Sequence, residues 1–344
     1  MRLKGISYDT GFLRNGASSR KLFDPAMVER ELRIIRDDLH CNAVRVIGGD
    51  PDRLELVASC AADLGLAVWF SPYPLELSAD DMLALFTDCA VRAERLRKRG
   101  ADVVFVTGAE LSLMNKGFLP GDTVEERLEV LLRPDGRNER ISEVGERVND
   151  VLRTAVSVVR THFGGKVTYA SIPLDRVDWD LFDIVSVDLY RSAAVADQFT
   201  AGVRALVAQG KPLAITEFGA ATYRGAGDRG AQGLEIVEYD AKGPVRLNGV
   251  YARDEAGQAA YVRELLEIFD AEGVDAAFVF LFALYDHVHR PDGDPRNDLD
   301  LASYGIVKVL DAGLGQVYPE MPWEPKAAFG ALAEHYRKVD ASSS

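Results

Sequence analysis

Residues 211–219, Lys-Pro-Leu-Ala-Ile-Thr-Glu-Phe-Gly, form a short apolar run that ends in a carboxylate and a glycine. The core of the run, residues 213–216, has the length and near-continuous hydrophobicity of a strand buried on both faces. Such strands are typical of parallel sheets, in which helices cover both faces. The stretch therefore predicts an α/β fold and places Glu217 at the carboxyl end of one strand.

Runs of the same kind recur along the chain, and amphipathic segments of helical periodicity separate them, which is the pattern of repeated βαβ units. The predicted strands are residues 3–8, 43–47, 67–71, 103–107, 166–171, 184–188, 213–216 and 277–282. The predicted helices are residues 25–39, 52–64, 79–99, 143–162, 194–209, 256–272 and 325–339. The first helix opens with Asp24 and Pro25, a capping side chain followed by a proline suited to the first turn.

Eight units of this kind predict a closed (β/α)₈ TIM barrel, although an open doubly wound sheet would share the alternation. The position of the polar residues favours the barrel, because they collect in long insertions after the carboxyl ends of strands. These insertions follow the fourth, seventh and eighth strands, at residues 111–141, 220–255 and 285–325. Barrels build their active sites from such loops. We expect one barrel catalytic domain over residues 1–340 and a disordered tail at residues 341–344.

Charge and composition limit the classes of partner. The chain has 344 residues and a formal net charge of −14, which disfavours nucleic acid and anionic membrane surfaces as partners. A small neutral or cationic substrate fits this charge better. The oligomeric state is left open.

The cysteines and the apolar runs bear on the compartment. The three cysteines, Cys41, Cys60 and Cys89, lack C-x-x-C spacing, so we expect buried thiols rather than disulfides or a zinc site. The first residues enter a strand without a stretch of signal-peptide length, and no later run reaches the roughly 18 apolar residues of a membrane span. We therefore expect a cytoplasmic location.

A second carboxylate follows the fourth predicted strand, where Val-Val-Phe-Val-Thr-Gly-Ala leads to Glu110. If Glu110 and Glu217 face one another across a barrel mouth, they suit retaining glycoside cleavage, in which two carboxyl groups stand about 5 to 5.5 Å apart. Each glutamate also has a structural interpretation. Glu217 could pair with a barrel arginine such as Arg45, and Glu110 could be a solvated loop acid.

Residues 215–219, Ile-Thr-Glu-Phe-Gly, and the segment around Glu110 together resemble the two catalytic segments of clan A glycoside hydrolases. Barrels of that superfamily carry an acid/base glutamate after the fourth strand and a nucleophile after the seventh. The resemblance implies that Glu217 is the nucleophile and Glu110 the acid/base. The family usually has an asparagine before the acid/base, where it contacts the sugar 2-hydroxyl, and this chain has Ala109, which leaves sugar identity and ordinary hydrolysis open.

Three further positions resemble the family template. Arg45, at the end of the second strand, is similar to the arginine that steadies the nucleophile, and Tyr190, after the sixth strand, to the tyrosine that hydrogen-bonds it. Asp188, on the sixth strand, is expected to join the same network. A purely structural role, such as neutralising a barrel carboxylate, is the alternative for these residues.

The family's tryptophan after the eighth strand is missing, so we expect Phe282 or Tyr285 to stack on substrate instead, and Tyr73 after the third strand is a similar candidate. Aromatic side chains pack cores equally well, so core packing is the alternative.

The loop at residues 286–298 holds His287 and His289 among several aspartates. It could line the substrate site, hold a metal through imidazole and carboxylate ligands, or be a solvated turn-rich loop. Its spacing matches no metal motif, so we expect no metal, and the proposed glycosidase mechanism needs no cofactor.

These features support a first hypothesis of a retaining glycosidase acting on a small glycoside or short oligosaccharide. A second hypothesis is a retasked barrel that performs transglycosylation, elimination or other acid–base chemistry on a small metabolite. A third is a non-catalytic carbohydrate-binding barrel. The sugar and the linkage are not specified by these residues, and fold alone does not decide among the hypotheses.

Overall fold

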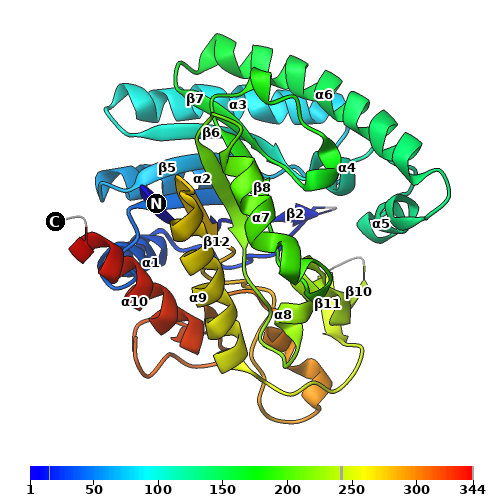
Figure 1. Cartoon of the computed structure of the whole chain (residues 1–344). Coiled ribbons are helices and arrows are strands. Elements are labelled where there is room, and N and C mark those ends of the chain that lie inside the picture. The colour runs from blue at the N-terminus through cyan, green and yellow to red at the C-terminus, as the bar shows by residue number, and fades with distance from the viewer. Residues whose placement is uncertain (15, 241–242, 343–344) are drawn as a thin grey trace. The chain divides into compact units, whose positions relative to one another are not determined.

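The computed structural model describes all residues except 15, 241–242 and 343–344 (Figure 1). The main sheet has eight strands: β1 (Leu3–Asp9), β4 (Ala43–Gly48), β5 (Ala67–Pro72), β6 (Val103–Ala109), β7 (Lys166–Ala170), β8 (Val185–Asp188), β9 (Leu213–Phe218) and β12 (Ala276–Val279). Their order is β7-β6-β5-β4-β1-β12-β9-β8, and a parallel bridge between Ser171 and Val187 connects the β7 and β8 ends. The sheet follows chain order and closes, so the predicted (β/α)₈ barrel is confirmed.

Seven long helices follow the predicted positions closely. They are α1 (Pro25–Asp37), α2 (Pro51–Asp63), α3 (Ala79–Lys98), α6 (Arg137–His162), α7 (Ala196–Val207), α9 (Glu255–Glu272) and α10 (Ala327–Ser342). The predicted cap of α1 is present, since the Asp24 side chain accepts a hydrogen bond of 2.9 Å from the Ala26 amide. Helix α6 begins six residues earlier than residue 143, because its first turn is exposed and shows no apolar periodicity.

The three predicted insertions contain short elements. Residues 111–136 contain α4 (Leu111–Met114) and α5 (Val124–Leu132). The insertion after β9 contains α8 (Ala226–Arg229) and the antiparallel pair β10 (Val237–Asp240) and β11 (Gly243–Leu247). The last insertion includes β13 (Val307–Val309) and β14 (Trp323–Pro325), so Pro325 ends a strand and does not begin the last helix. Helix α10 extends into the predicted tail, of which residues 343–344 lie outside the described residues.

The chain divides into two compact units. The second unit comprises residues Thr10–Ser18 and Arg45–Asp188. Within it β5, β6 and β7 pair in parallel, α3 packs against α6, and α2 packs against α3. The Phe105 ring lies 6.2 Å from the Phe70 ring and 5.9 Å from the Phe163 ring, measured between centroids, so a cluster of aromatic rings fills part of this core.

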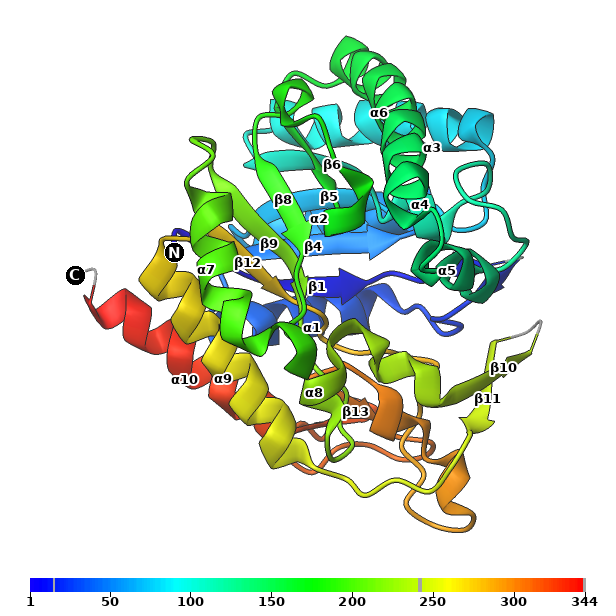
Figure 2. The same ribbon diagram turned by 45° about the vertical axis from the view of Figure 1, so that its right-hand side comes forward.

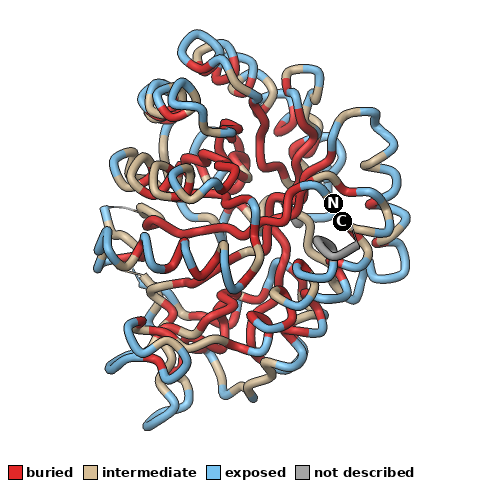
Figure 3. Tube along the Cα trace, turned by 90° about the vertical axis from the view of Figure 1, so that its left-hand side faces the viewer, coloured by how far each residue is buried: buried red, intermediate tan, exposed pale blue. Residues whose placement is uncertain are grey.

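The first unit comprises residues Met1–Asp9, Ser19–Val44 and Leu189–Ser344. In it β12 pairs in parallel with both β1 and β9, and α9 packs against α7 and α10. Helix α10 runs beside α9 in both views of the ribbon (Figure 1 and Figure 2). The strands are buried along their length while each helix exposes one side (Figure 3). Whether the two units act as the single catalytic domain predicted for residues 1–340 stays a prediction.

Two predictions about the wider chain can be compared with this structure. All three cysteines are free, and Cys41 and Cys89 are buried as expected, whereas Cys60 is partly exposed. In the described part of the chain, no helix has both the length and the apolar character that a bilayer crossing demands.

A buried ion-pair network connects the loops of the first unit. Asp300 has no appreciable exposure and accepts a hydrogen bond of 2.7 Å from Arg253, and its other carboxylate oxygen lies 2.8 Å from Nζ of Lys326. Burial lowers the pKa of Lys326, whereas the charge of Asp300 acts to raise it. The Lys326 ammonium therefore depends on Asp300 to remain charged inside the protein.

We predict that Asp300→Ala lowers the free energy of unfolding by about 3 to 5 kcal/mol, because it leaves a buried lysine without its counter-charge. The matched control is Asp311→Ala, which removes one partner of an exposed pair with Arg290 and should change the free energy of unfolding far less. Chemical denaturation of both variants measures the difference. Equal losses in the two variants would contradict a buried role for Asp300.

Candidate active site

Glu217 lies at the carboxyl end of β9, and its side chain is almost fully buried, with 4% of the residue exposed. The Tyr190 hydroxyl donates a hydrogen bond of 3.1 Å to Oε2 of Glu217. The main chain beside it is also held, because the Leu189 amide donates to the Glu217 carbonyl at 2.8 Å. The contact between tyrosine and carboxylate that the family resemblance implies is therefore present.

Two neighbours restrict movement around Glu217. The Tyr190 ring meets Tyr304 edge to face with centroids 5.8 Å apart, so the hydroxyl that reaches Glu217 is carried on a packed ring. Gly219 approaches the main chain after β12 so closely that an added Cβ would lie 2.5 Å from the Phe280 carbonyl oxygen. Only glycine fits at this distance, which explains the residue that follows Glu217-Phe218.

Glu110 occupies a strained turn after β6. Its backbone is left-handed, with φ of 45° and ψ of 42°, a conformation that costs a non-glycine residue about 1 kcal/mol or more. The Glu110 amide donates to the Ala170 carbonyl at 2.9 Å, and its own carbonyl accepts from the amides of Leu113 and Met114 at 3.0 Å. Glu110 is therefore fixed at the start of α4 and is half-buried.

A buried polar cluster lies directly behind this turn. The Tyr169 hydroxyl accepts a hydrogen bond of 2.8 Å from the Leu111 amide and donates one of 2.6 Å to Oδ2 of Asp175. The Ser112 hydroxyl donates to the other carboxylate oxygen, Oδ1. Burial raises the pKa of Asp175 to about 6, although the hydrogen bonds from Ser112 and Tyr169 act to lower it. These residues escaped the sequence analysis because Tyr169 lies in an apolar strand and Asp175 in a turn, and only the folded chain brings them together.

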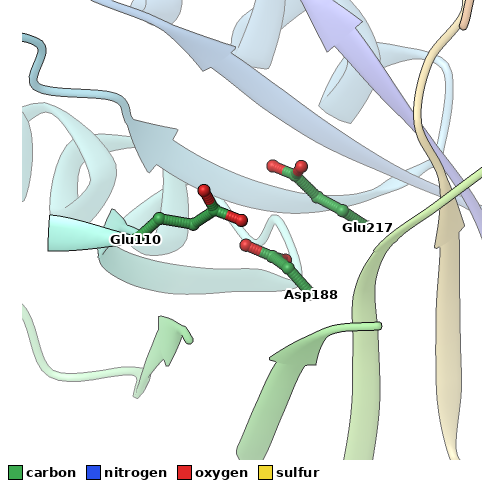
Figure 4. Close-up of side chains that lie close together, drawn as sticks. All are labelled: Glu110, Asp188 and Glu217. Atoms are coloured by element: carbon green, nitrogen blue, oxygen red, sulfur yellow. The ribbon is translucent and has the colours of Figure 1, made fainter. Parts of the chain in front are cut away.

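Asp188 ends β8, and its side chain has no exposed surface. A guanidinium nitrogen of Arg45 lies 3.9 Å from Oδ1 of Asp188, and Nε of Arg45 donates to Ser71 at 3.2 Å. One carboxylate oxygen of Asp188 lies within 4.8 Å of one of Glu110, and Figure 4 draws these side chains with that of Glu217. Within this unit Arg45 therefore compensates a buried acid, as the structural interpretation of Arg45 expects.

Ala109 is the last residue of β6 and is fully buried. The pairing of β6 with β7 shifts register between Val106 and Ala109, so the strand is irregular just before Glu110. A methyl side chain offers no hydrogen bond at the position where the family has an amide. The departure seen in the sequence is therefore a real chemical difference in the strand next to Glu110.

The aromatic candidates for stacking on substrate belong mainly to the core. Phe282 has no exposed surface and packs edge to face on Trp323 with centroids 5.2 Å apart, so no face of its ring is available to a ligand. The Tyr285 hydroxyl donates to Glu31 at 2.9 Å, and the Arg20 guanidinium covers its ring at 3.9 Å. For these two residues the core interpretation replaces the stacking interpretation. Tyr73 is 5% exposed and packs edge-on against Phe12.

The loop at residues 286–298 is held by local contacts between histidine rings and carboxylates. Nδ1 of His287 lies 2.8 Å from Oδ1 of Asp286, and Nδ1 of His289 lies 2.9 Å from Oδ1 of Asp298. Burial acts to raise the pKa of Asp298, but hydrogen bonds from His289 and Arg253 lower it to about 2. Among the described residues of this loop, no three histidine or acidic side chains converge as a metal site would require.

The comparisons with known proteins identify the fold. No family model and no curated protein sequence matches the chain. A solved structure titled GH113 β-1,4-mannanase is similar, with a TM-score of 0.62 and 17% identity over 98% of this chain and 99% of the mannanase. The chain shares the barrel fold of that glycoside hydrolase.

Glucuronidases have a similar barrel as part of longer chains. A structure of Bacteroides uniformis β-glucuronidase 2 matches with a TM-score of 0.59 and 14% identity, over 98% of this chain and 35% of the glucuronidase. A β-glucuronidase from Ruminococcus gnavus matches with a TM-score of 0.52 and 14% identity, over 98% of this chain and 49% of that protein. At such low identities these likenesses establish the fold and no more.

The pKa of Asp175 predicts a pH-dependent stability. Because the folded-state pKa of about 6 lies above the ordinary value of 3.8, the stability present below pH 4 is lost as the pH rises through 6. We predict that Asp175→Asn removes this loss, which amounts to about 3 kcal/mol between pH 4 and pH 7.5. Free energies of unfolding of both proteins across this pH range test it. Parallel pH profiles for the two proteins would show that Asp175 does not titrate with a raised pKa.

Proposed function

We propose that this protein is a retaining glycosidase, in which Glu217 is the nucleophile and Glu110 the acid/base. Within the second unit, one carboxylate oxygen of Glu110 lies within 4.8 Å of one of Asp188. The observation that carries the proposal lies in the first unit, where Glu217 is buried at the carboxyl end of β9 and accepts a hydrogen bond from the Tyr190 hydroxyl. The proposal requires the carboxyl groups of Glu110 and Glu217 to stand about 5 to 5.5 Å apart when they act on one bond.

The different surroundings of the two glutamates support different roles. The Tyr190 hydroxyl donates to Glu217, and a donated hydrogen bond stabilises an ionised carboxylate, the form that a nucleophile requires. Glu110 lies next to the Asp188 carboxylate, and a neighbouring negative charge favours the protonated form of an acid. A protonated Glu110 is what the first chemical step requires.

In the proposed reaction the Glu217 carboxylate attacks the anomeric carbon while Glu110 gives its proton to the departing glycosidic oxygen. The bond between sugar and leaving group breaks, and a covalent glycosyl ester forms on Glu217. Glu110, now ionised, removes a proton from water, whose oxygen attacks the anomeric carbon and releases Glu217. The sugar leaves with its original anomeric configuration, and no cofactor takes part.

The buried Ala109 favours a second candidate function. Hydrogen bonds to the sugar 2-hydroxyl strengthen in the transition state and supply several kcal/mol in the glycosidase template, and the Ala109 methyl group cannot provide one. The same two carboxylates could then perform transglycosylation or elimination on a small metabolite. The substrate would in either case be a small molecule.

A panel of dinitrophenyl and alkyl glycosides tests the proposal with Glu217→Gln and Glu110→Gln. We expect Glu217→Gln to lower kcat by more than about 10³-fold, because the covalent step is lost, and Glu110→Gln to lower it by about 10²- to 10⁴-fold on substrates that need protonation. Added azide should restore turnover of activated substrates to Glu110→Gln, because a small anion does not need a general base. The matched control is Glu146→Gln, an exposed glutamate on α6, which should leave activity unchanged.

Covalent labelling identifies the nucleophile directly. The glucuronidase from Bacteroides uniformis is titled as covalently bound to cyclophellitol-6-carboxylate aziridine, so aziridines of this class with varied sugar configuration are suitable probes. We expect mass spectrometry to find the label on Glu217 in the wild type and none in Glu217→Gln. Hydrolysis that survives Glu217→Gln would refute the retaining mechanism. Substrate binding without any turnover or labelling would instead favour the retasked or the non-catalytic barrel.

A further inference from the structure

We propose that Tyr169 and Asp175 are positioning residues for Glu110, which fix the left-handed turn from which its carboxyl group is presented. The inference rests on the proposed function, because it assigns the pair a task in the acid/base step. It concerns β7 and the turn after it, which the family resemblance and the comparisons do not address.

The first step of the argument is the backbone of Glu110. The direction of a side chain follows the φ and ψ angles of its own residue, and Glu110 has angles that most residues avoid. Such a conformation persists only where the surroundings over-determine it. The bonds to Ala170, Leu113 and Met114 fix the amide and carbonyl of Glu110 itself.

The second step is the pair of residues that follow. Leu111 and Ser112 are the next two residues, and both are linked to the Asp175 carboxylate by hydrogen bonds. The Ser112 hydroxyl donates to it directly, and the Leu111 amide donates to the Tyr169 hydroxyl, which in turn donates to Asp175. Asp175 thus uses both of its oxygens to fix the two residues after Glu110. A rotation of the turn would have to break these bonds.

The third step is burial. Leu111, Tyr169 and Asp175 have no exposed surface, and Ser112 is 1% exposed, so water cannot replace a lost partner. Removal of the Tyr169 hydroxyl would leave the Leu111 amide and an Asp175 oxygen buried without these partners, which destabilises the turn. The turn is expected to relieve this by rotating, and rotation moves the Glu110 carboxyl group.

Electrostatics supports proximity between the pair and Glu110. Burial raises the pKa of Tyr169 well above its ordinary value, and the negative charges of Asp175 and Glu110 raise it further. The Tyr169 hydroxyl therefore lies within the field of the Glu110 carboxylate. Glu217 differs, because Tyr190 contacts its carboxylate directly.

The test compares substrates that do and do not need a proton. For Tyr169→Phe we expect kcat/KM to fall about 10- to 100-fold on an alkyl glycoside, since small misplacement of a general acid costs about this much. On a dinitrophenyl glycoside, whose leaving group needs no proton, glycosylation should change less than about 3-fold. The control is Tyr336→Phe, which loses a buried hydroxyl that donates to the Gly5 carbonyl, and which should affect both substrates equally.

Two further measurements separate the inference from the proposed function. If Glu110→Gln shows no dependence on the leaving group, the proposed acid/base role fails before Tyr169 is considered. If the activity of Glu110→Gln depends on the leaving group and that of folded Tyr169→Phe does not, the positioning inference is overturned. A readout that needs no turnover is ¹³C NMR of labelled glutamate carboxyl groups, in which the Glu110 signal is assigned by its loss in Glu110→Gln. Tyr169→Phe should shift the titration midpoint of the Glu110 carboxyl group. An unchanged midpoint would overturn the inference.

Discussion

The cost of burying acidic side chains governs the construction of this protein. A carboxylate at the end of a strand buried on both faces has lost most of its water, and it is tolerated only where hydrogen bonds or a counter-charge replace that water. Three acids near the strand ends have such partners within their own unit: Tyr190 for Glu217, Arg45 for Asp188, and Tyr169 with Ser112 for Asp175. These partners also set the direction in which each carboxyl group points.

The partners differ in kind, and the difference bears on chemistry. A neutral hydroxyl donates to Glu217, as the proposed role of this residue as a nucleophile requires. The Arg45 cation lies beside Asp188 and offsets the negative charge of that buried acid. For Glu110 the backbone is held on both sides, because its amide and its carbonyl are both hydrogen-bonded within a left-handed turn.

The same rule explains why several sequence candidates became core residues. Tyr285 and Trp323 both donate to Glu31, a fully buried acid of α1 that also pairs with Arg20. Phe282 packs on Trp323 in this cluster. Side chains after the eighth strand thus donate hydrogen bonds to a buried carboxylate. The rings of tyrosine and tryptophan suit contact with a sugar as well, so the residue types alone do not tell the two roles apart. The loop at residues 286–298 is held in a similar way by Arg253.

Hydrophobic periodicity and capping residues are local signals, so they predicted each strand and helix from the sequence, and the eight units with three long loops favoured a closed barrel over an open sheet. A carboxylate that closes an apolar run is visible without knowledge of its neighbours, so Glu110 and Glu217 were located at strand ends in the same way. The side chains that hold the turn after Glu110, and those that hold Glu31, became visible only in the folded chain. Tyr169, Ser112 and Asp175 belong to three separate segments, and Tyr285 and Glu31 are separated by most of the chain. Hydrogen-bond partners across such distances depend on strand order and register, and no local pattern encodes them.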